Sequence, residues 1–191
     1  MEYNVIRSKR KTLSLQIKDG KVIVRAPLYA SGRTIEKFVD ANAGWIEKTL
    51  AKSRKIAENR KTEIEKNGLL TEKDIYELAQ KAVEVIPGRV NYYAPIIGVK
   101  VGRITIRRQK SKWGSASAKG NLNFNCLLML APPEVLDSVV VHELCHLIEM
   151  NHSERFYRLV LSVMPDYYER QKWLKENGNI LMARAFPESS L

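Results

Sequence analysis

The chain contains the stretch His142-Glu143-Leu144-Cys145-His146, which follows the H-E-x-x-H pattern. Pro132-Pro133 precedes this stretch and apolar residues surround it, so we predict a helix over about residues 133–150 with one buried side. Side chains at positions i and i+4 lie on one face of a helix. The two histidines can therefore both present a ring nitrogen to one metal ion, at the zinc–imidazole distance of ~2.0–2.1 Å.

A third histidine, His152, follows beyond the predicted end of that helix. Catalytic zinc usually has three protein ligands and one open position, and the same spacing of three histidines occurs in metzincins. All three histidines of the chain fall within residues 142–152. We therefore predict a Zn²⁺ site formed by His142, His146 and His152. The alternative is a third ligand from a later helix, Glu169 or Glu176.

Glu143 lies next to the first histidine and is the predicted catalytic residue. Its carboxylate can reach a zinc-bound water without being a ligand itself, and can act there as general base. Zinc lowers the pKa of its water and polarises the electrophile. The residue that stabilises the oxyanion is open at this point, with Tyr157, Arg108 and Asn125 as candidates.

Two groups of short strands are indicated by alternation of apolar and polar residues. The first group covers residues 3–7, 12–18 and 21–26, with Asp19-Gly20 as a hairpin turn, and the second covers residues 99–108, 112–117 and 121–125. In the second group, Trp113-Gly114-Ser115 is a candidate substrate-binding strand, because an extended peptide can add to the edge of a sheet and glycine permits a close approach. The alternative is a strand with a buried tryptophan and a tolerated glycine.

Helices are predicted after three capping residues, Ser31, Thr71 and Ser153. We expect the helix after Thr71 to end near Pro87, with a further turn that reaches Tyr93. Two more helices are predicted, over about residues 41–59 and from Pro165 onward. Together with the small sheet, which we expect to be antiparallel, these elements indicate an α+β fold.

The net charge of +11 is unevenly distributed. Residues 1–61 contain 15 Lys/Arg and 6 Asp/Glu, whereas residues 62–191 contain 17 and 15. The charged stretch 59–70 is the best candidate boundary, so we predict a basic β-rich subdomain over residues 1–60 and a second domain over residues 61–191. The basic surface can contact nucleic acid weakly, but a solvated surface without a partner is favoured, because no nucleic-acid-binding motif is present.

Location and redox state follow from simple features. The N-terminus lacks the charged and apolar regions of a signal peptide and no long apolar run occurs, so we expect a cytoplasmic protein without membrane contact. Cys126 and Cys145 do not form a disulfide framework, and we expect free thiols.

The motifs together resemble those of the YgjP-like metallopeptidase family. The resemblance covers most of the chain, including the basic N-terminal hairpin, and its motifs lie in four runs: residues 108–117, 120–125, 142–146 and 151–157. It implies a small zincin-like core, with zinc on the three histidines and a catalytic Glu143, similar to the WLM and SprT-type metallopeptidases. The family pattern W-G-S-C-S departs here, because Ala116 stands in place of the cysteine, which argues that no thiol is needed there.

A zinc-dependent metallopeptidase that cleaves a peptide or protein is therefore the predicted function. One alternative is a nucleoside triphosphate pyrophosphatase, a role assigned to some members of that family; the six Lys/Arg of residues 100–112, Arg108 among them, could bind a nucleotide. Phosphohydrolases more often gather carboxylates around Mg²⁺, and no such cluster is apparent. The other alternative is a nucleic-acid-binding or protein-binding module with a structural zinc.

Overall fold

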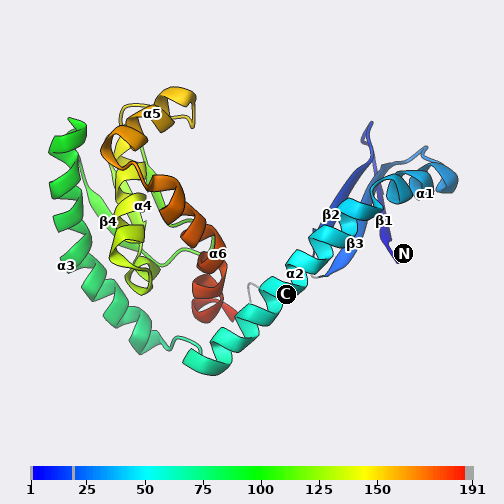
Figure 1. The fold of residues 1–191 in the computed structure, drawn as a ribbon, viewed down its shortest axis with the longest axis horizontal. Coiled ribbons are helices and arrows are strands. Elements are labelled where there is room, and N and C mark those ends of the chain that lie inside the picture. Colours follow the sequence, from blue (N-terminus) through cyan, green and yellow to red (C-terminus); the bar gives the residue numbers. More distant parts are fainter. Residues whose placement is uncertain (1, 19, 188–191) are drawn as a thin grey trace. The chain divides into compact units, whose positions relative to one another are not determined.

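The computed structural model describes residues 2–18 and 20–187, which divide into two compact units (Figure 1). The first unit ends at Lys66, and the second begins at Asn67. Each unit combines helices with a three-stranded sheet, so the predicted α+β class is confirmed. Among the described residues, no helix has both the length and the apolar character that crossing a membrane requires.

The sheet of the first unit consists of β1 (Asn4–Ser8), β2 (Ser14–Lys18) and β3 (Lys21–Pro27). Their order is β1-β3-β2, with β1 parallel and β2 antiparallel to the central strand β3. Gly20 has a φ of 71° at the turn between β2 and β3, which glycine adopts without steric cost. Asp19, the other predicted turn residue, lies outside the described residues.

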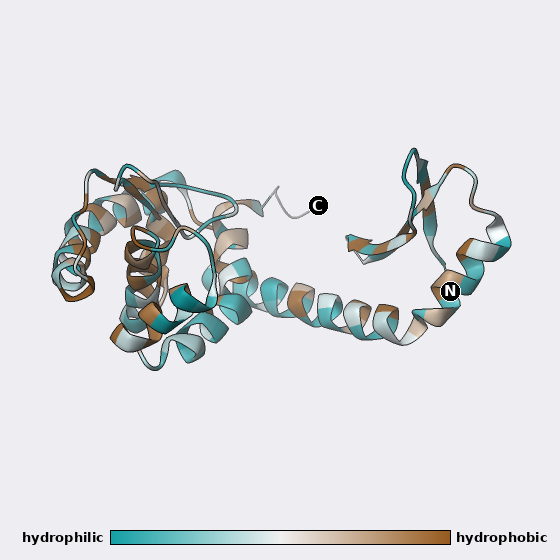
Figure 2. Cartoon of the chain, turned by 90° about the horizontal axis from the view of Figure 1, so that it is seen from above, coloured by the Kyte–Doolittle hydropathy of each residue, from teal (hydrophilic) through white to brown (hydrophobic). Residues whose placement is uncertain are grey.

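Two helices follow in this unit, α1 (Gly32–Ala41) and α2 (Ala43–Asn67). The side chain of Ser31 accepts a hydrogen bond from the backbone N–H of Thr34, as expected of the predicted cap. A small core contains only aliphatic side chains, Val22, Val24, Ala26, Ile35, Val39 and Ile46. The prediction that this helix ends near residue 59 was wrong, because α2 continues to Asn67. The predicted boundary at residues 60–61 therefore lies inside α2. Figure 2 shows α2 as largely hydrophilic, and Ile46 is its one buried residue.

The second unit begins with α3 (Glu72–Ile97). Thr71 and Asp74 form a reciprocal capping box, which confirms the predicted start. The expected end near Pro87 was wrong, because α3 continues through Pro87 and Pro95. A proline removes one helical hydrogen bond and costs about 3 kcal/mol. Buried Ile86 and Val90, on either side of the first proline, pack into the core and offset that cost.

The sheet of the second unit contains β4 (Ile104–Arg107), β5 (Gly114–Ala116) and β6 (Leu122–Asn125). The prediction of an antiparallel sheet was wrong. The sheet is mixed, because its central strand β6 is parallel to β4 and antiparallel to β5. The predicted strand 99–108 is shortened at its start, where the backbone N–H of Gly102 donates to the carbonyl of Gly120 instead of to a neighbouring strand. In the described residues β5 pairs only with β6, and its other edge is free of backbone partners.

A 3-10 helix, η1 (Cys126–Leu130), leads into α4 (Pro133–Cys145), which is followed by α5 (Glu154–Val163) and α6 (Tyr167–Ala185). Almost every residue of α4 is buried, and α3, α5, α6 and β5 all contact it (Figure 1). Cys126 and Cys145 are both buried and free, as expected. The core of this unit is therefore assembled around the helix that carries His142 and Glu143.

Candidate metal centre

The end of α4 positions the histidines. The helix was predicted to reach residue 150, but it ends at Cys145, and residues 146–148 form turns. Because the helix stops there, the chain turns back and brings His152 beside the two histidines of α4. Ser153 then caps α5, accepting a hydrogen bond from the backbone N–H of Phe156.

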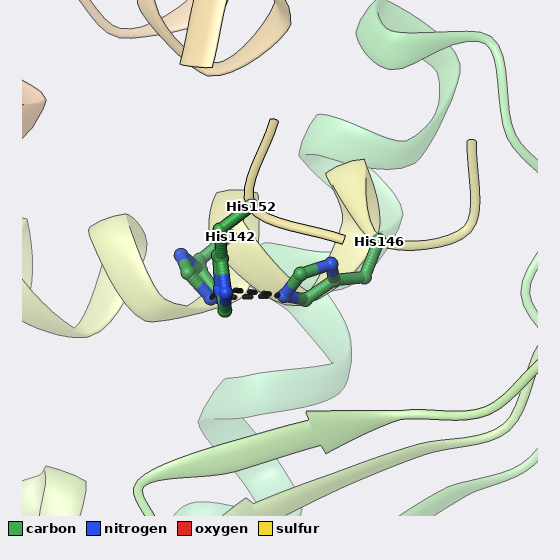
Figure 3. A group of neighbouring side chains, drawn as sticks. All are labelled: His142, His146 and His152. Carbon is green, nitrogen blue, oxygen red and sulfur yellow. Dashed lines mark hydrogen bonds between the residues drawn. The ribbon is translucent and has the colours of Figure 1, made fainter. Parts of the chain in front are cut away.

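Figure 3 shows the three imidazole rings converging on one point. The Nε2 atom of His146 lies 3.1 Å from that of His142 and 3.1 Å from that of His152, and the remaining pair is 3.0 Å apart. Nitrogens that bind one zinc ion at ~2.0–2.1 Å lie within about 4 Å of one another. In the described residues these histidines are the only group of three or more His, Cys, Asp or Glu side chains arranged so that they can hold a metal ion.

The other ring nitrogens of two histidines have partners in the protein. Nδ1 of His146 lies 2.9 Å from the carbonyl oxygen of Glu149. A carbonyl only accepts, so Nδ1 carries the proton, and Nε2 of the neutral ring presents a lone pair. Nδ1 of His142 lies 2.6 Å from the hydroxyl of Tyr167. Such contacts orient metal-ligating histidines and set their tautomer. Lone pairs that face one another at 3 Å repel, so this donor set fits a cation between them.

Phe156 closes the inner side of the group. Its side chain is completely buried, and its ring stacks on His146 with centroids 4.5 Å apart. The ring also contacts His142 at 4.9 Å and His152 at 5.0 Å, both edge-on. One apolar residue therefore packs against all three imidazoles and excludes water from behind them.

Burial keeps the rings in the form that binds metals. Burial, together with the smaller effect of the neighbouring histidines, lowers the pKa of His142 to about 3. The pKa of His146 is also lowered, mainly by burial. Neutral imidazole is the ligating form, so both rings are competent for metal binding at neutral pH.

Glu143 lies one residue after the first histidine, with 6% of its surface exposed. Burial raises the pKa of its carboxyl to about 7, although the positive charge of Lys112 opposes the shift. A base with a pKa near the working pH is best suited to proton transfer. The position and the pKa of this carboxyl are those that a general base requires.

Gly114 of β5 lies directly against that carboxylate. A Cβ atom at this position would be 2.6 Å from Oε1 and 2.7 Å from Cγ of Glu143. Any side chain here would therefore displace the carboxylate. The sequence suggested that glycine makes room for a substrate, whereas in the structure the close neighbour is Glu143 itself.

The other two residues of the candidate substrate strand flank this contact. Trp113 packs on α6, where a Cβ at Gly178 would lie 3.0 Å from Cζ2 of the indole. Ser115 accepts a hydrogen bond of 3.2 Å from the side-chain amide of Asn123 on β6. The indole is therefore held against a helix, next to the strand that contacts Glu143.

The three oxyanion candidates have different surroundings. Arg108 donates to the Glu72 carboxylate and to the carbonyl of Ala185, at 2.7 Å each. The side chain of Asn125 donates to two backbone carbonyls, of Gln109 and Lys112. The side chains of Arg108 and Asn125 therefore form structural hydrogen bonds within the protein. The ring of Tyr157 stacks near His152, with centroids 6.3 Å apart, and is the candidate that adjoins the histidines.

Two contributors were missed by the sequence analysis, Phe156 and Tyr167. Phe156 lies four residues after His152, a spacing that could have suggested contact across the start of α5. No local signal relates Tyr167 to His142, because their contact depends on how α6 packs on α4. Glu169 and Glu176, the alternative third ligands, are not part of the histidine group.

A mixed α+β unit in which three histidines converge at the end of the central helix α4 and in the loop that follows it is the architecture of a candidate metallohydrolase. The family model described as "YgjP-like, metallopeptidase domain" matches residues 11–76 and 71–177. Since these ranges cover most of the chain, it belongs to the YgjP-like metallopeptidase family, as the sequence motifs predicted. Membership in this family supports a hydrolase that depends on a divalent metal.

No curated protein matches the chain. The crystal structure of the metallopeptidase zymogen of Pyrococcus abyssi abylysin is similar, with a TM-score of 0.44 and 22% sequence identity. That match covers 48% of this chain and 94% of the other.

Proposed function

We propose that the protein is a single-zinc metallopeptidase with a zincin-like core. The observation that carries the proposal is the convergence of three Nε2 atoms within 3.1 Å of one another. His142, His146 and His152 would hold the ion. Because residues 2–18 and 20–187 offer three protein ligands and no fourth, one position would stay open for chemistry, unlike a closed structural site.

The chemistry divides between the ion and the chain. Zinc, when bound, supplies a Lewis acid that favours ionisation of water and polarises the carbonyl of the substrate. Glu143 accepts the proton of the attacking water at its carboxylate and returns it to the leaving amine. Tyr167 and the Glu149 carbonyl keep the first two histidines in position, and Phe156 excludes water behind them.

The free edge of β5 is the proposed binding site for the substrate backbone. An extended peptide can add to this edge by main-chain hydrogen bonds, beside the carboxylate of Glu143. Trp113, Gly114 and Ser115 belong to or adjoin this edge and are the proposed substrate-binding residues. We assign no contact with the substrate to Arg108, because Glu72 and the Ala185 carbonyl already engage its guanidinium.

We propose that the second unit, which begins at Asn67, forms the catalytic domain and that the first unit forms a basic β-rich subdomain, so that the division falls six residues after the predicted boundary at residues 60–61. The aliphatic core of the first unit and its excess of Lys/Arg support this division. No observation on the described residues favours a phosphohydrolase over a peptidase, since no cluster of carboxylates adjoins the histidines.

A peptide library tests the proposal. We expect zinc-loaded protein to cleave peptide bonds, and metal-stripped protein to lose that activity and regain it when zinc is restored. The control is the same stripping and reloading applied to His152→Ala. If fully zinc-loaded protein cleaves no peptide, or if stripping leaves cleavage unchanged, the metallopeptidase proposal is wrong.

A further inference from the structure

The second unit contains a pocket of about 550 Å³. One wall is Trp113, and the other walls come from one face of α6. We call it the Trp113–α6 pocket; its lining residues are Trp113, Tyr168, Gln171, Lys172, Leu174, Lys175 and Asn179. A volume of this size accommodates one large side chain of a bound peptide or a small ligand.

Two walls of the pocket connect it with the catalytic groups. On one side, Trp113 directly precedes Gly114, whose Cα lies against the Glu143 carboxylate. On the other side, the ring of Tyr168 is 6.0 Å from that of Tyr157, which in turn neighbours His152. A substrate backbone that lies along β5 would therefore pass beside the opening of this pocket.

The pocket has an apolar wall and two exposed positive charges. The indole of Trp113 rests on Gly178, which fixes its orientation. Lys172 and Lys175 are exposed, and neither ammonium group forms an ion pair or hydrogen bond with any residue of 2–18 or 20–187. No acidic residue lines the pocket. Its lining residues therefore carry two positive charges and no negative charge, while Glu169 and Glu176 lie three and four residues from Lys172 on α6.

We propose that the Trp113–α6 pocket binds an acidic side chain of the peptide substrate and so determines the sequence preference of the enzyme. This inference rests on the proposed peptidase function. The methylene groups of a glutamate would pack on the indole of Trp113, while its carboxylate would meet Lys172 and Lys175. Such contacts made near the reacting bond contribute to discrimination between substrates.

A phosphorylated ligand fits the same surface less well. Sites for phosphate chains are usually built from backbone N–H groups at a helix N-terminus and from forked arginine side chains. Apart from Trp113 and from Tyr168 in the first turn of α6, the pocket is instead lined by residues from further along α6, where the backbone N–H groups are used in the helix, and its lining contains no arginine. A carboxylate needs only point charges and an apolar surface beside them.

Paired peptides that differ only by Glu or Gln near the cleaved bond test the inference. We expect kcat/KM of the zinc-loaded protein to be about 2–30-fold higher for the Glu peptide, the range that two exposed charge contacts supply. The double variant Lys172→Gln/Lys175→Gln should lose the preference, and Lys172→Glu/Lys175→Glu should favour Lys peptides. Lys81→Gln, another exposed helical lysine, is the matched control and should retain the preference.

A second readout separates this inference from the peptidase proposal. Binding of labelled Glu and Gln peptides to zinc-loaded Glu143→Gln protein is measured by fluorescence anisotropy, which needs no turnover. Tighter binding of the Glu peptide that disappears in the lysine double variant supports the pocket, even if no peptide is cleaved. Equal binding of both peptides overturns the inference, whether or not cleavage occurs. The inference is also overturned if inorganic triphosphate binds through the two lysines and acidic peptides do not bind.

Discussion

The two sheets of the protein have the same strand order and the same directions, yet their surroundings differ. In each sheet the third strand is central, parallel to the first and antiparallel to the second. The first sheet packs into a core whose fully buried side chains are all aliphatic. Within the described residues, all buried polar side chains belong to the second unit: Asn125, Asp137, Ser138, Glu143 and His146. The strand arrangement alone therefore creates no site; the polar residues of α4 do.

Burial of these groups is costly unless each one has a partner. His146 has the Glu149 carbonyl, and Asp137 has Arg89, which donates to it from α3. Glu143 is instead buried against Gly114, and burial raises the pKa of its carboxyl. Titratable groups whose pKa is strongly shifted by burial are typical of functional sites.

The largest effect is expected for Glu143→Gln. It removes the proposed base and keeps the shape, so kcat/KM for peptide cleavage should fall by about 10²–10⁴-fold while zinc content is unchanged. Glu36→Gln, on α1 of the first unit, is the matched control and should retain full activity. Steady-state kinetics and metal analysis provide the two readouts. An active Glu143→Gln variant would remove the residue from the mechanism.

A pair of glycine substitutions gives the next largest contrast. In Gly114→Ala the new Cβ would lie 2.6 Å from Oε1 of Glu143, so the carboxylate must move. A displacement of about 1 Å at a catalytic group can cost about 100-fold in rate, and we expect a loss of that size in kcat. Gly44→Ala, in α2, has open space around the new Cβ and should leave kcat unchanged while raising stability by up to about 1 kcal/mol. Equal activity of the two variants would contradict the proposed contact.

Loss of the Tyr167 hydroxyl should have a smaller effect, on metal affinity. Tyr167→Phe removes the partner of Nδ1 of His142, which lies 2.6 Å away. Loss of such a partner typically weakens zinc binding about 10–100-fold. Competition with a chromophoric chelator measures the affinity, and Tyr168→Phe on the next residue of α6 is the control. Unchanged affinity in Tyr167→Phe would show that the hydroxyl does not orient the histidine.

The smallest effect concerns the stability of the metal-free protein at acid pH. The pKa of His142 is lowered to about 3 in the folded state, from an ordinary value of 6.5. Between these values the unfolded chain binds a proton that the folded chain does not, so stability falls as the pH drops below about 6.5. Glu143 acts in the opposite direction, because its raised pKa makes the folded state take up a proton below about pH 7.

Comparison of the wild type with His142→Gln isolates the histidine. In urea denaturation from about pH 7.5 to pH 5, the metal-free variant should lose less stability than the metal-free wild type. No histidine occurs in residues 1–66, so this difference should be absent from any separate transition of the first unit. Parallel pH curves for the two proteins would show that this ring does not resist protonation.

Features encoded by neighbouring residues were predicted from the sequence, whereas features that depend on packing were not. The caps at Ser31, Thr71 and Ser153 are local and were confirmed. The convergence of His142 and His146 follows from helix periodicity alone. The continuation of α3 through Pro87 was not predicted, because burial of residues on both sides of the proline outweighs its local cost.

Within the candidate site the same distinction holds. Glu143 was selected from its place in the motif, but its contact with Gly114 requires knowledge that β5 packs on α4. Tyr167 and Lys172 come from α6, at a distance along the chain that no spacing rule covers. The parallel pairing of β4 with β6 likewise depends on the path of the chain between them, and strand alternation cannot reveal it.

The metallopeptidase proposal requires that His142, His146 and His152 bind a single zinc ion. Anomalous diffraction from crystals of zinc-loaded protein, recorded on both sides of the zinc absorption edge, tests it directly. We predict one strong peak at ~2.0–2.1 Å from the three Nε2 atoms, with no fourth protein ligand. A peak elsewhere, or a fourth ligand such as Glu169 or Glu176 closing the site, would contradict the account.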